Sequence, residues 1–314
     1  MKLSNNTSTS RTQAKDKMQD NYKFEPNQLL NFSSGSYLER TSRPIYAIVF
    51  LLPFIIFYEF GTFFMNTSLL NNTQVRVVAF LWLQNALSYI GFGDRLTWMA
   101  PAFAVLVILL ASQIVARKKW TIKLADLWIM SLECLVLAIP LVVLSFVLNT
   151  SPSATSDTAA AQLYLQKIQN AICLLDAPCI AQLQASMPAD SLLANIVTSI
   201  GAGIYEEMVF RFILICLLMF FLQDILQLNR KSALLISVLI SAALFSIHHH
   251  IIFLNGHFTK PIPFQWSQFF FRTTAGIYFA FLFAIRGFGI TAGSHAFYDI
   301  IATLINAFFF PPTH

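Results

Sequence analysis

The sequence predicts an all-α protein, a polytopic transmembrane helical bundle of about 7–8 spans with one further helix in the membrane interface. The first observation is composition: of 314 residues, 56% are hydrophobic and only 11% are charged. Soluble domains carry about 25% charged residues, so this chain cannot cover its surface with solvated groups. The second observation is that apolar runs close to membrane-spanning length recur from residue 43 onward. We therefore expect an integral membrane protein whose surroundings are a lipid bilayer.

Three regions are expected along the chain. Residues 1–40 are polar, basic and rich in Ser, Thr and Asn, which is typical of a disordered tail. Residues 41–190 contain the first spans and a polar loop at 150–190, which we expect on the outer side. Residues 191–310 contain the spans that carry charged and His side chains, so we expect this domain to hold the functional site.

Eight apolar runs define the predicted spans: 43–65, 77–92, 98–116, 126–149, 191–222, 232–253, 265–285 and 288–310. The run 77–92 is short and carries polar residues, so it is expected to lie in the interface. The basic residues of the remaining loops then fall mainly on one side: Arg40, Arg43, those in 116–123, Arg230, Lys231 and Arg286. The positive-inside rule places the N-terminus in the cytoplasm and the C-terminus outside, with about seven spans, and we expect the plasma (inner) membrane.

The net charge and the cysteine positions indicate which partners and which covalent links to expect. The net charge of +5 is modest and is spread between apolar segments, so no nucleic-acid partner is expected. Cys134 and Cys216 lie in apolar runs and read as packing residues. Cys173 and Cys179 flank "LLDAP" in the polar loop and can form a disulfide if that loop faces an oxidising compartment.

The stretch "YEEMVFR" places three charges inside an apolar run. Residues four apart share a helix face, so Glu207 and Arg211 can pair. Glu206 is turned by about 100° and can face another group. A charge near a bilayer centre costs about 2.5–3.5 kcal/mol on insertion scales, and such residues mark functional sites more often than not. A buried structural ion pair is the alternative.

Two later spans carry histidines. In "FSIHHH", His249 follows Phe245 by four residues, and we expect His249 to face the site while His248 and His250 cap the helix at the interface. In "GSHAFYDII", His295 and Asp299 share one face, and small residues at 292–294 and 296 allow close helix packing. The predicted boundaries put His249 near the outer end of its span and His295 near the inner end of its own.

Together these groups suit hydrolysis in an interior cavity. A carboxylate can take a proton from water while imidazoles bind or polarise a carbonyl. The same groups could ligate a divalent metal such as zinc, with Glu206, His249, His295 and Asp299 as candidate ligands. No H-E-x-x-H helix, the strongest zinc-protease signal, is present.

Three motifs in order resemble the CPBP intramembrane proteases, which include the CAAX prenyl endopeptidases and bacterial relatives linked to bacteriocin processing and immunity (the Abi type). They are E-E-x-x-x-R at Glu206–Arg211, F-x-x-x-H at Phe245–His249 and H-x-x-x-N/D at His295–Asp299. The resemblance covers about residues 190–310. It implies an intramembrane endopeptidase that cleaves near the C-terminus of prenylated or other membrane-associated peptides.

The resemblance also implies roles for each matched residue. Glu206 would activate the attacking water, His249 and His295 would support the water and the tetrahedral intermediate, and Glu207 with Arg211 would shape the site. The family has been described both as metalloproteases and as glutamate proteases, and both remain open here. Asp299 stands where prenyl-protein proteases usually have Asn; it would orient His295, be protonated or bind a metal.

Two other classes of function remain as alternatives. One is a non-enzymatic immunity or scaffold protein of the same fold, which would not need Glu206 or His249. The other is a proton-coupled transporter, because intramembrane Glu and His relays also occur there. Transporters often contain internal repeats, and the sequence shows none.

Overall fold

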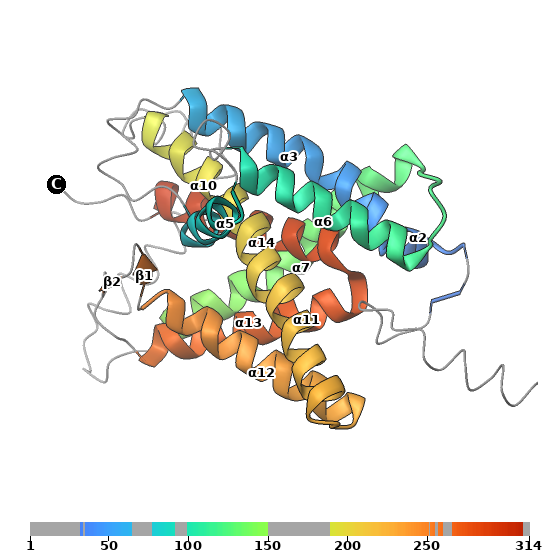
Figure 1. Ribbon diagram of the computed structural model, residues 1–314. Helices are drawn as coiled ribbons and strands as arrows, with labels where there is room; N and C mark the ends of the chain where they lie inside the picture. Colours follow the sequence, from blue (N-terminus) through green and yellow to red (C-terminus); the bar gives the residue numbers. More distant parts are fainter. Residues whose placement is uncertain are drawn as a thin grey trace, which may run out of the picture.

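The computed structural model describes residues 32–33, 35–64, 77–91, 99–149, 189–250, 252–254, 257–259 and 266–309 (Figure 1). The first half contains α2 (Tyr37–Thr41), α3 (Pro44–Phe64), α5 (Val78–Tyr89), α6 (Ala100–Ala116) and α7 (Leu124–Asn149). The second half contains α10 (Ala189–Glu207), η1 (Met208–Ile213), α11 (Leu214–Met219), η2 (Phe220–Ile225), α12 (Arg230–His248), β1 (Ile252–Leu254), β2 (His257–Thr259), α13 (Trp266–Arg286) and α14 (Phe288–Phe309).

The predicted membrane bundle is confirmed. Within the described ranges, 6 helices are long and apolar enough to cross a membrane, and each falls on a predicted run. Helix α6 is apolar but shorter, with 17 residues. Helix α5 has 12 residues, and at about 1.5 Å per residue it falls well short of a hydrocarbon core of about 30 Å. The chain is therefore an integral membrane protein, and the length of α5 agrees with an interfacial position.

Two departures from the predicted helices lie close to the polar motifs. The run expected at 191–222 extends over Leu192–Ile225 and contains the two π-helical segments η1 and η2. The run expected at 232–253 ends as a helix at His248, and the chain then forms a short antiparallel β1–β2 hairpin. The π turns and the end of α12 at His248 determine which polar side chains come into contact.

Some predicted regions lie outside the described part of the chain. These are residues 1–31 and 34 of the expected tail and residues 150–188 of the expected loop, including Cys173 and Cys179. Residues Tyr37–Thr41 were assigned in part to the tail but form helix α2, which Ser36 caps by accepting a hydrogen bond from the backbone N–H of Glu39. A side-chain cap of this kind satisfies an otherwise unpaired donor of the first turn.

Helix α14 lies in the middle of the bundle, in contact with α3, α7, α10 and α13 (Figure 1). Its approach to α10 is very close: a Cβ added at Gly203 would lie 2.6 Å from the backbone nitrogen of Ala296. On another side, a Cβ added at Gly293 would lie 2.7 Å from the sulfur of Cys134. The predicted close packing of small residues and the packing role of Cys134 are both confirmed.

One end of the bundle is held together by a partly buried ion pair and its hydrogen bonds. Arg286 at the end of α13 donates to both carboxylate oxygens of Glu133 on α7, at 2.6 and 2.8 Å, and also reaches Ser42 and Thr41 beside α2. Tyr37 donates to the same carboxylate at 2.7 Å. Arg286 therefore does more than signal orientation, since it fastens α13 to α7 and to the segment around α2.

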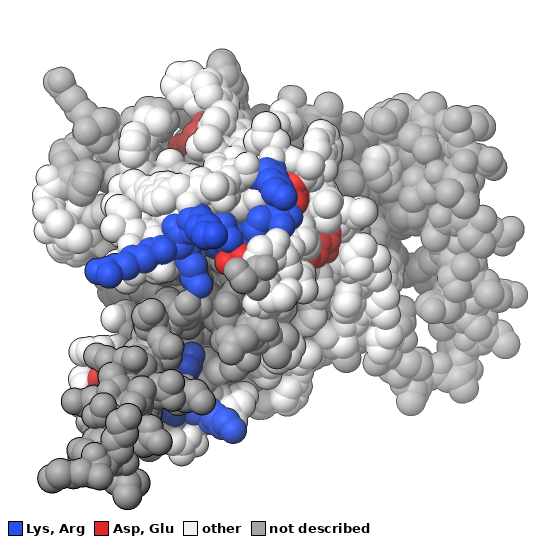
Figure 2. All heavy atoms as spheres, turned by 90° about the vertical axis from the view of Figure 1, so that its right-hand side faces the viewer, with Lys and Arg blue, Asp and Glu red and all other residues white. Residues whose placement is uncertain are grey.

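A second group of contacts lies at the same end. Arg40 donates to both oxygens of Asp126, at 2.9 and 3.0 Å, and Arg43 pairs with Glu39 at 2.6 Å. The guanidinium of Arg43 lowers the pKa of Glu39 below its ordinary value. Figure 2 shows Lys and Arg side chains gathered over this end of the molecule.

Candidate active site

Glu206 and Glu207 end helix α10, at the point where the chain passes from α-helical to π-helical turns. Glu207 and Arg211 are fully buried, and the Nη1 atom of Arg211 lies 3.1 Å from Oε1 of Glu207. The predicted pair is therefore confirmed. Single π turns inside longer helices occur frequently at functional sites, because they re-aim side chains without ending the helix.

Glu207 also holds His295. The Nδ1 atom of His295 lies 2.7 Å from Oε1 of Glu207, a distance typical of a charge-assisted hydrogen bond in which the imidazole donates. The Nε2 atom of the same ring lies 3.4 Å from Oδ2 of Asp299 and 3.9 Å from Oε2 of Glu206. His295 and Asp299 thus face the same site, as their spacing predicted.

Two aromatic rings support these polar groups. The guanidinium carbon of Arg211 lies 4.1 Å from the ring centroid of Phe245, a cation–π contact. The ring of His295 stacks on Phe279 with centroids 4.5 Å apart and planes inclined by 17°. The Phe of the F-x-x-x-H motif therefore covers the buried cation, and α13 supplies a ring that orients His295.

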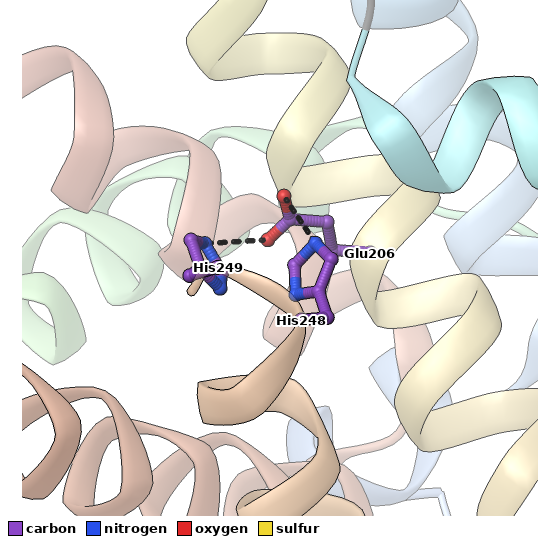
Figure 3. A group of neighbouring side chains, drawn as sticks. All are labelled: Glu206, His248 and His249. Atoms are coloured by element: carbon purple, nitrogen blue, oxygen red, sulfur yellow. Dashed lines mark ion pairs between the residues drawn. The ribbon is translucent and has the colours of Figure 1, made fainter. Parts of the chain in front are cut away.

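Two adjacent histidines face Glu206 from the end of α12 (Figure 3). The Nε2 atom of His248 lies 4.0 Å from Oε1 of Glu206, and the Nε2 atom of His249 lies 4.0 Å from Oε2. The Nδ1 atom of each ring lies 2.9 Å from the carbonyl oxygen of Phe245. Because that carbonyl can only accept, both rings donate through Nδ1, and each Nε2 directs a lone pair toward Glu206.

The position expected for His248 at a lipid–water interface is wrong, because its side chain is 6% exposed and lies beside Glu206. The reason is the helix end, where carbonyls lack an intrahelical partner. The carbonyl of Phe245 is three residues before His248 and four before His249, so both imidazoles can fold back onto it. His250 is buried too, with its ring centroid 6.4 Å from Phe269.

The group around Glu206 has room for a small ligand. At 4.0 Å the carboxylate and the two rings are too far apart for direct hydrogen bonds, and this spacing suits a bridging water or ion. The side chains of His249 and Asp299 are 27% and 28% exposed, whereas that of Glu206 is 8% exposed. The site is therefore buried at the carboxylate and accessible along His249 and Asp299.

One group of side chains meets the geometry of a metal site within the described ranges: Glu206, His248 and His249, whose ligand atoms lie within 4.8 Å of one another. The predicted set had His295 and Asp299 in place of His248. Two imidazoles and a carboxylate are a known zinc ligand set. Each imidazole also donates its other ring N–H to a backbone carbonyl, as metal-bound histidines usually do, so the residues present fit a divalent ion.

The predicted difference in depth between His249 and His295 does not keep them apart, since both rings lie within 4.0 Å of Glu206. Helix α12 ends at His248, five residues before the predicted boundary. The long run from α10 to η2 crosses the bundle obliquely in Figure 1.

Sequence reasoning missed two polar residues near these motifs. Glu59 in α3 is buried and accepts a hydrogen bond of 3.1 Å from the hydroxyl of Tyr205, the residue before Glu206. Arg272 in α13 interacts electrostatically with Glu206. Both are charges inside apolar runs, which is the same signal that identified the other site residues.

A protein-family model matches the helices that carry these side chains. Residues 188–301 match the family described as type II CAAX prenyl endopeptidase Rce1-like. This segment belongs to that protease family. The Rce1-like segment runs from α10 into α14 and contains all six predicted site residues, Glu206, Glu207, Arg211, His249, His295 and Asp299. No curated protein and no solved structure matched the chain. The predicted family is thereby confirmed, and it indicates a CAAX-type intramembrane endopeptidase.

Proposed function

We propose that the protein hydrolyses a peptide bond inside the membrane with water activated by Glu206. The observation that carries this proposal is the carboxylate of Glu206 with imidazole Nε2 atoms 4.0, 4.0 and 3.9 Å away, in the Rce1-like segment. These gaps suit a bound water, and a buried carboxylate next to imidazoles suits general base catalysis. The proposed substrates are prenylated or other membrane-associated peptides cleaved near their C-terminus.

In the proposed mechanism, a water lies between Glu206 and the Nε2 atoms of His248 and His249. Glu206 takes a proton as the water oxygen attacks the scissile carbonyl carbon, and the carbonyl oxygen becomes an oxyanion. Glu206 then returns that proton to the departing amine, so the carboxylate is regenerated when the C–N bond breaks. His295, held by Glu207 at 2.7 Å, lies 3.9 Å from Glu206 and 3.4 Å from Asp299 and stabilises the developing charge.

The ion pair of Glu207 with Arg211 has a positioning role in this mechanism. Removing one partner of a buried pair leaves an uncompensated charge, which typically costs about 3–5 kcal/mol. The pair therefore holds the oxygen that orients His295, while Arg211 is itself fixed by the ring of Phe245.

A divalent metal fits the same group. Glu206, His248 and His249 would hold it, and it would supply a water with a lowered pKa and polarise the scissile carbonyl. In that case the Nε2 atoms would be ligands and Glu206 would bind the ion. The two forms of the mechanism predict opposite responses to a chelator.

We further propose that the N-terminus is cytoplasmic and that the protein lies in the plasma (inner) membrane. Basic side chains gather at the end of the bundle formed by α2, the C-terminal end of α6 and the start of α7, where positive-inside counting places the cytoplasm (Figure 2).

The test of the proposed function is cleavage of a farnesylated C-terminal peptide by the purified protein in detergent, with products identified by mass spectrometry. We expect cleavage at one peptide bond, with an OH from water on the new C-terminus and an H on the new N-terminus. Loss of activity in chelator and recovery with zinc would favour the metal form, and activity in chelator without bound metal the glutamate form. A protein that cleaves no prenylated or membrane-bound peptide would contradict the proposal.

A further inference from the structure

Arg272 lies on the face of α13 that lines the site. Gly276 follows it by one turn, and its carbonyl oxygen lies 3.5 Å from the Nη2 atom of Arg211. Phe279 follows by two turns and stacks on His295. Residues at i, i+4 and i+7 share a helix face, so Arg272 extends the same row toward the start of α13.

Groups from three other elements lie within electrostatic range of Arg272. Its guanidinium interacts electrostatically with Glu206 and Tyr298, and it also acts on the imidazoles of His248, His249 and His250. The chain packing agrees with this position, because the hydroxyl of Ser246 donates to the carbonyl of Phe269, which fixes the end of α12 against the start of α13. Arg272 is thus a cation at the edge of the Glu206 group.

The guanidinium of Arg272 has unused binding capacity. Its Nη1 atom is buried and has no hydrogen-bond partner within the described ranges. Arg211 also has buried nitrogens, Nε and Nη1, without a hydrogen-bond partner in the described ranges, but its charge is paired with Glu207 at 3.1 Å and covered by the ring of Phe245. An arginine does not lose its charge in proteins, so a buried guanidinium nitrogen without a partner is expected to receive an acceptor when a ligand enters.

We propose that Arg272 is the side chain that binds the C-terminal carboxylate of the peptide substrate. This inference rests on the proposed function. A planar guanidinium matches a carboxylate with two parallel hydrogen bonds. The Nη1 atom is buried, so its ligand must enter a confined space. The end of a peptide chain fits such a space, whereas an acidic side chain in the middle of a peptide would need room for the residues on both of its sides.

The test compares matched prenylated peptides that end in a free carboxylate or in an amide, together with an amide peptide that has Glu as its last residue. We expect the wild-type protein to prefer the free carboxylate by about tenfold or more in kcat/KM, mainly through KM, as for loss of a hydrogen bond to a charged group. Arg272→Gln should lower kcat/KM for the carboxylate peptide much more than for the amide peptide, so that the preference for a free carboxylate is lost. Arg272→Lys should keep part of the preference, and Arg230→Gln, an exposed arginine at the start of α12, should keep all of it.

Three results would overturn the proposal. They are equal cleavage of carboxylate and amide by the wild type, an equal loss for both peptides in Arg272→Gln, and a preference restored by the Glu side chain. If Arg272→Gln does not insert into the membrane, the ratio of carboxylate to amide cleavage in the wild type and in Arg272→Lys still tests the proposal. If the wild type cleaves no peptide, the proposed function fails separately, and titration with fluorescent carboxylate and amide peptides decides whether Arg272 reads the carboxylate.

Discussion

The carboxylate of Glu206 is flanked by two imidazoles that share one backbone acceptor, the carbonyl of Phe245. This shared acceptor sets the tautomer of both rings, so each Nε2 is free to accept a proton or bind an ion. The two adjacent histidines at this helix end therefore have the same tautomer, and each ring faces a different carboxylate oxygen of Glu206.

His248→Ala tests this arrangement. Because each ring faces a different oxygen of Glu206, removal of either should lower kcat/KM by about 10–100-fold or more, since loss of a group that only supports such a site already has an effect of this size. Cleavage assays on His248→Ala and His249→Ala, normalised to folded protein, measure the effect. His250→Ala, the third residue of the run, is the matched control and should retain most of the activity. Wild-type rates in His248→Ala would show that His249 alone serves Glu206.

Spacing along a single helix predicted some of these residue contacts and not others. Glu207 with Arg211, and His295 with Asp299, are i,i+4 pairs and could be predicted without a fold. The contact of His248 with Glu206 depends on where α12 ends, and the bond of His295 to Glu207 depends on how α14 packs on α10. Neither fact is encoded in a local pattern.

At the scale of the element, the approach of α10 to α14 positions both carboxylates. Gly203 lies one turn before Glu207, and its absent side chain lets the backbone of α14 come close enough for His295 to reach Glu207. A glycine inside a helix is otherwise unfavourable by about 1 kcal/mol relative to alanine. Its presence here is explained by the helix contact.

Gly203→Ala is expected to be destabilising although alanine is the better helix former. The new Cβ would lie 2.6 Å from the backbone nitrogen of Ala296, and relief of that clash must separate the two helices. Overpacking of this kind typically costs about 1–3 kcal/mol. We expect a lower thermal midpoint in detergent and a loss of cleavage activity. A rise in the midpoint, as helix propensity alone would give, would contradict the close packing.

Helix existence was predictable from apolar runs, whereas interruptions of the helices were not. The runs 43–65, 126–149, 265–285 and 288–310 correspond to α3, α7, α13 and α14 within a few residues. The π turns of η1 lie inside the predicted run 191–222 and do not interrupt it, and that run stops within η2, where Gln223 and Asp224 follow. The end of α12 at His248 was hidden because the following residues, Ile251–Leu254, continue the apolar run.

At the scale of the whole molecule, the bundle has a polar end tied by arginine–carboxylate pairs and a site built farther along the same helices. Arg286 joins α13 to α7, and the Rce1-like segment includes α13 but not α7. The first half of the chain thus supports the family segment through the ion pair of Glu133 with Arg286 and through the hydrogen bond of Glu59 with Tyr205.

The proposed orientation predicts which positions a membrane-impermeant thiol reagent reaches. Single cysteines placed at Tyr89, at the end of α5, and at Lys119, after α6, are compared in a background without native cysteines, since both positions are exposed. In intact spheroplasts we expect labelling of Tyr89→Cys, and labelling of Lys119→Cys only after lysis. The reverse pattern would place the N-terminus outside and contradict the positive-inside assignment.

Glu206→Gln provides the sharpest test of peptide hydrolysis at this carboxylate. The amide keeps the shape of the side chain and cannot take a proton from water, so cleavage of the farnesylated peptide should fall by about 10²–10⁴-fold, the contribution typical of general base catalysis. The thermal midpoint and membrane insertion should stay close to wild type. A fully active Glu206→Gln protein would contradict the assignment of Glu206 as the group that activates water.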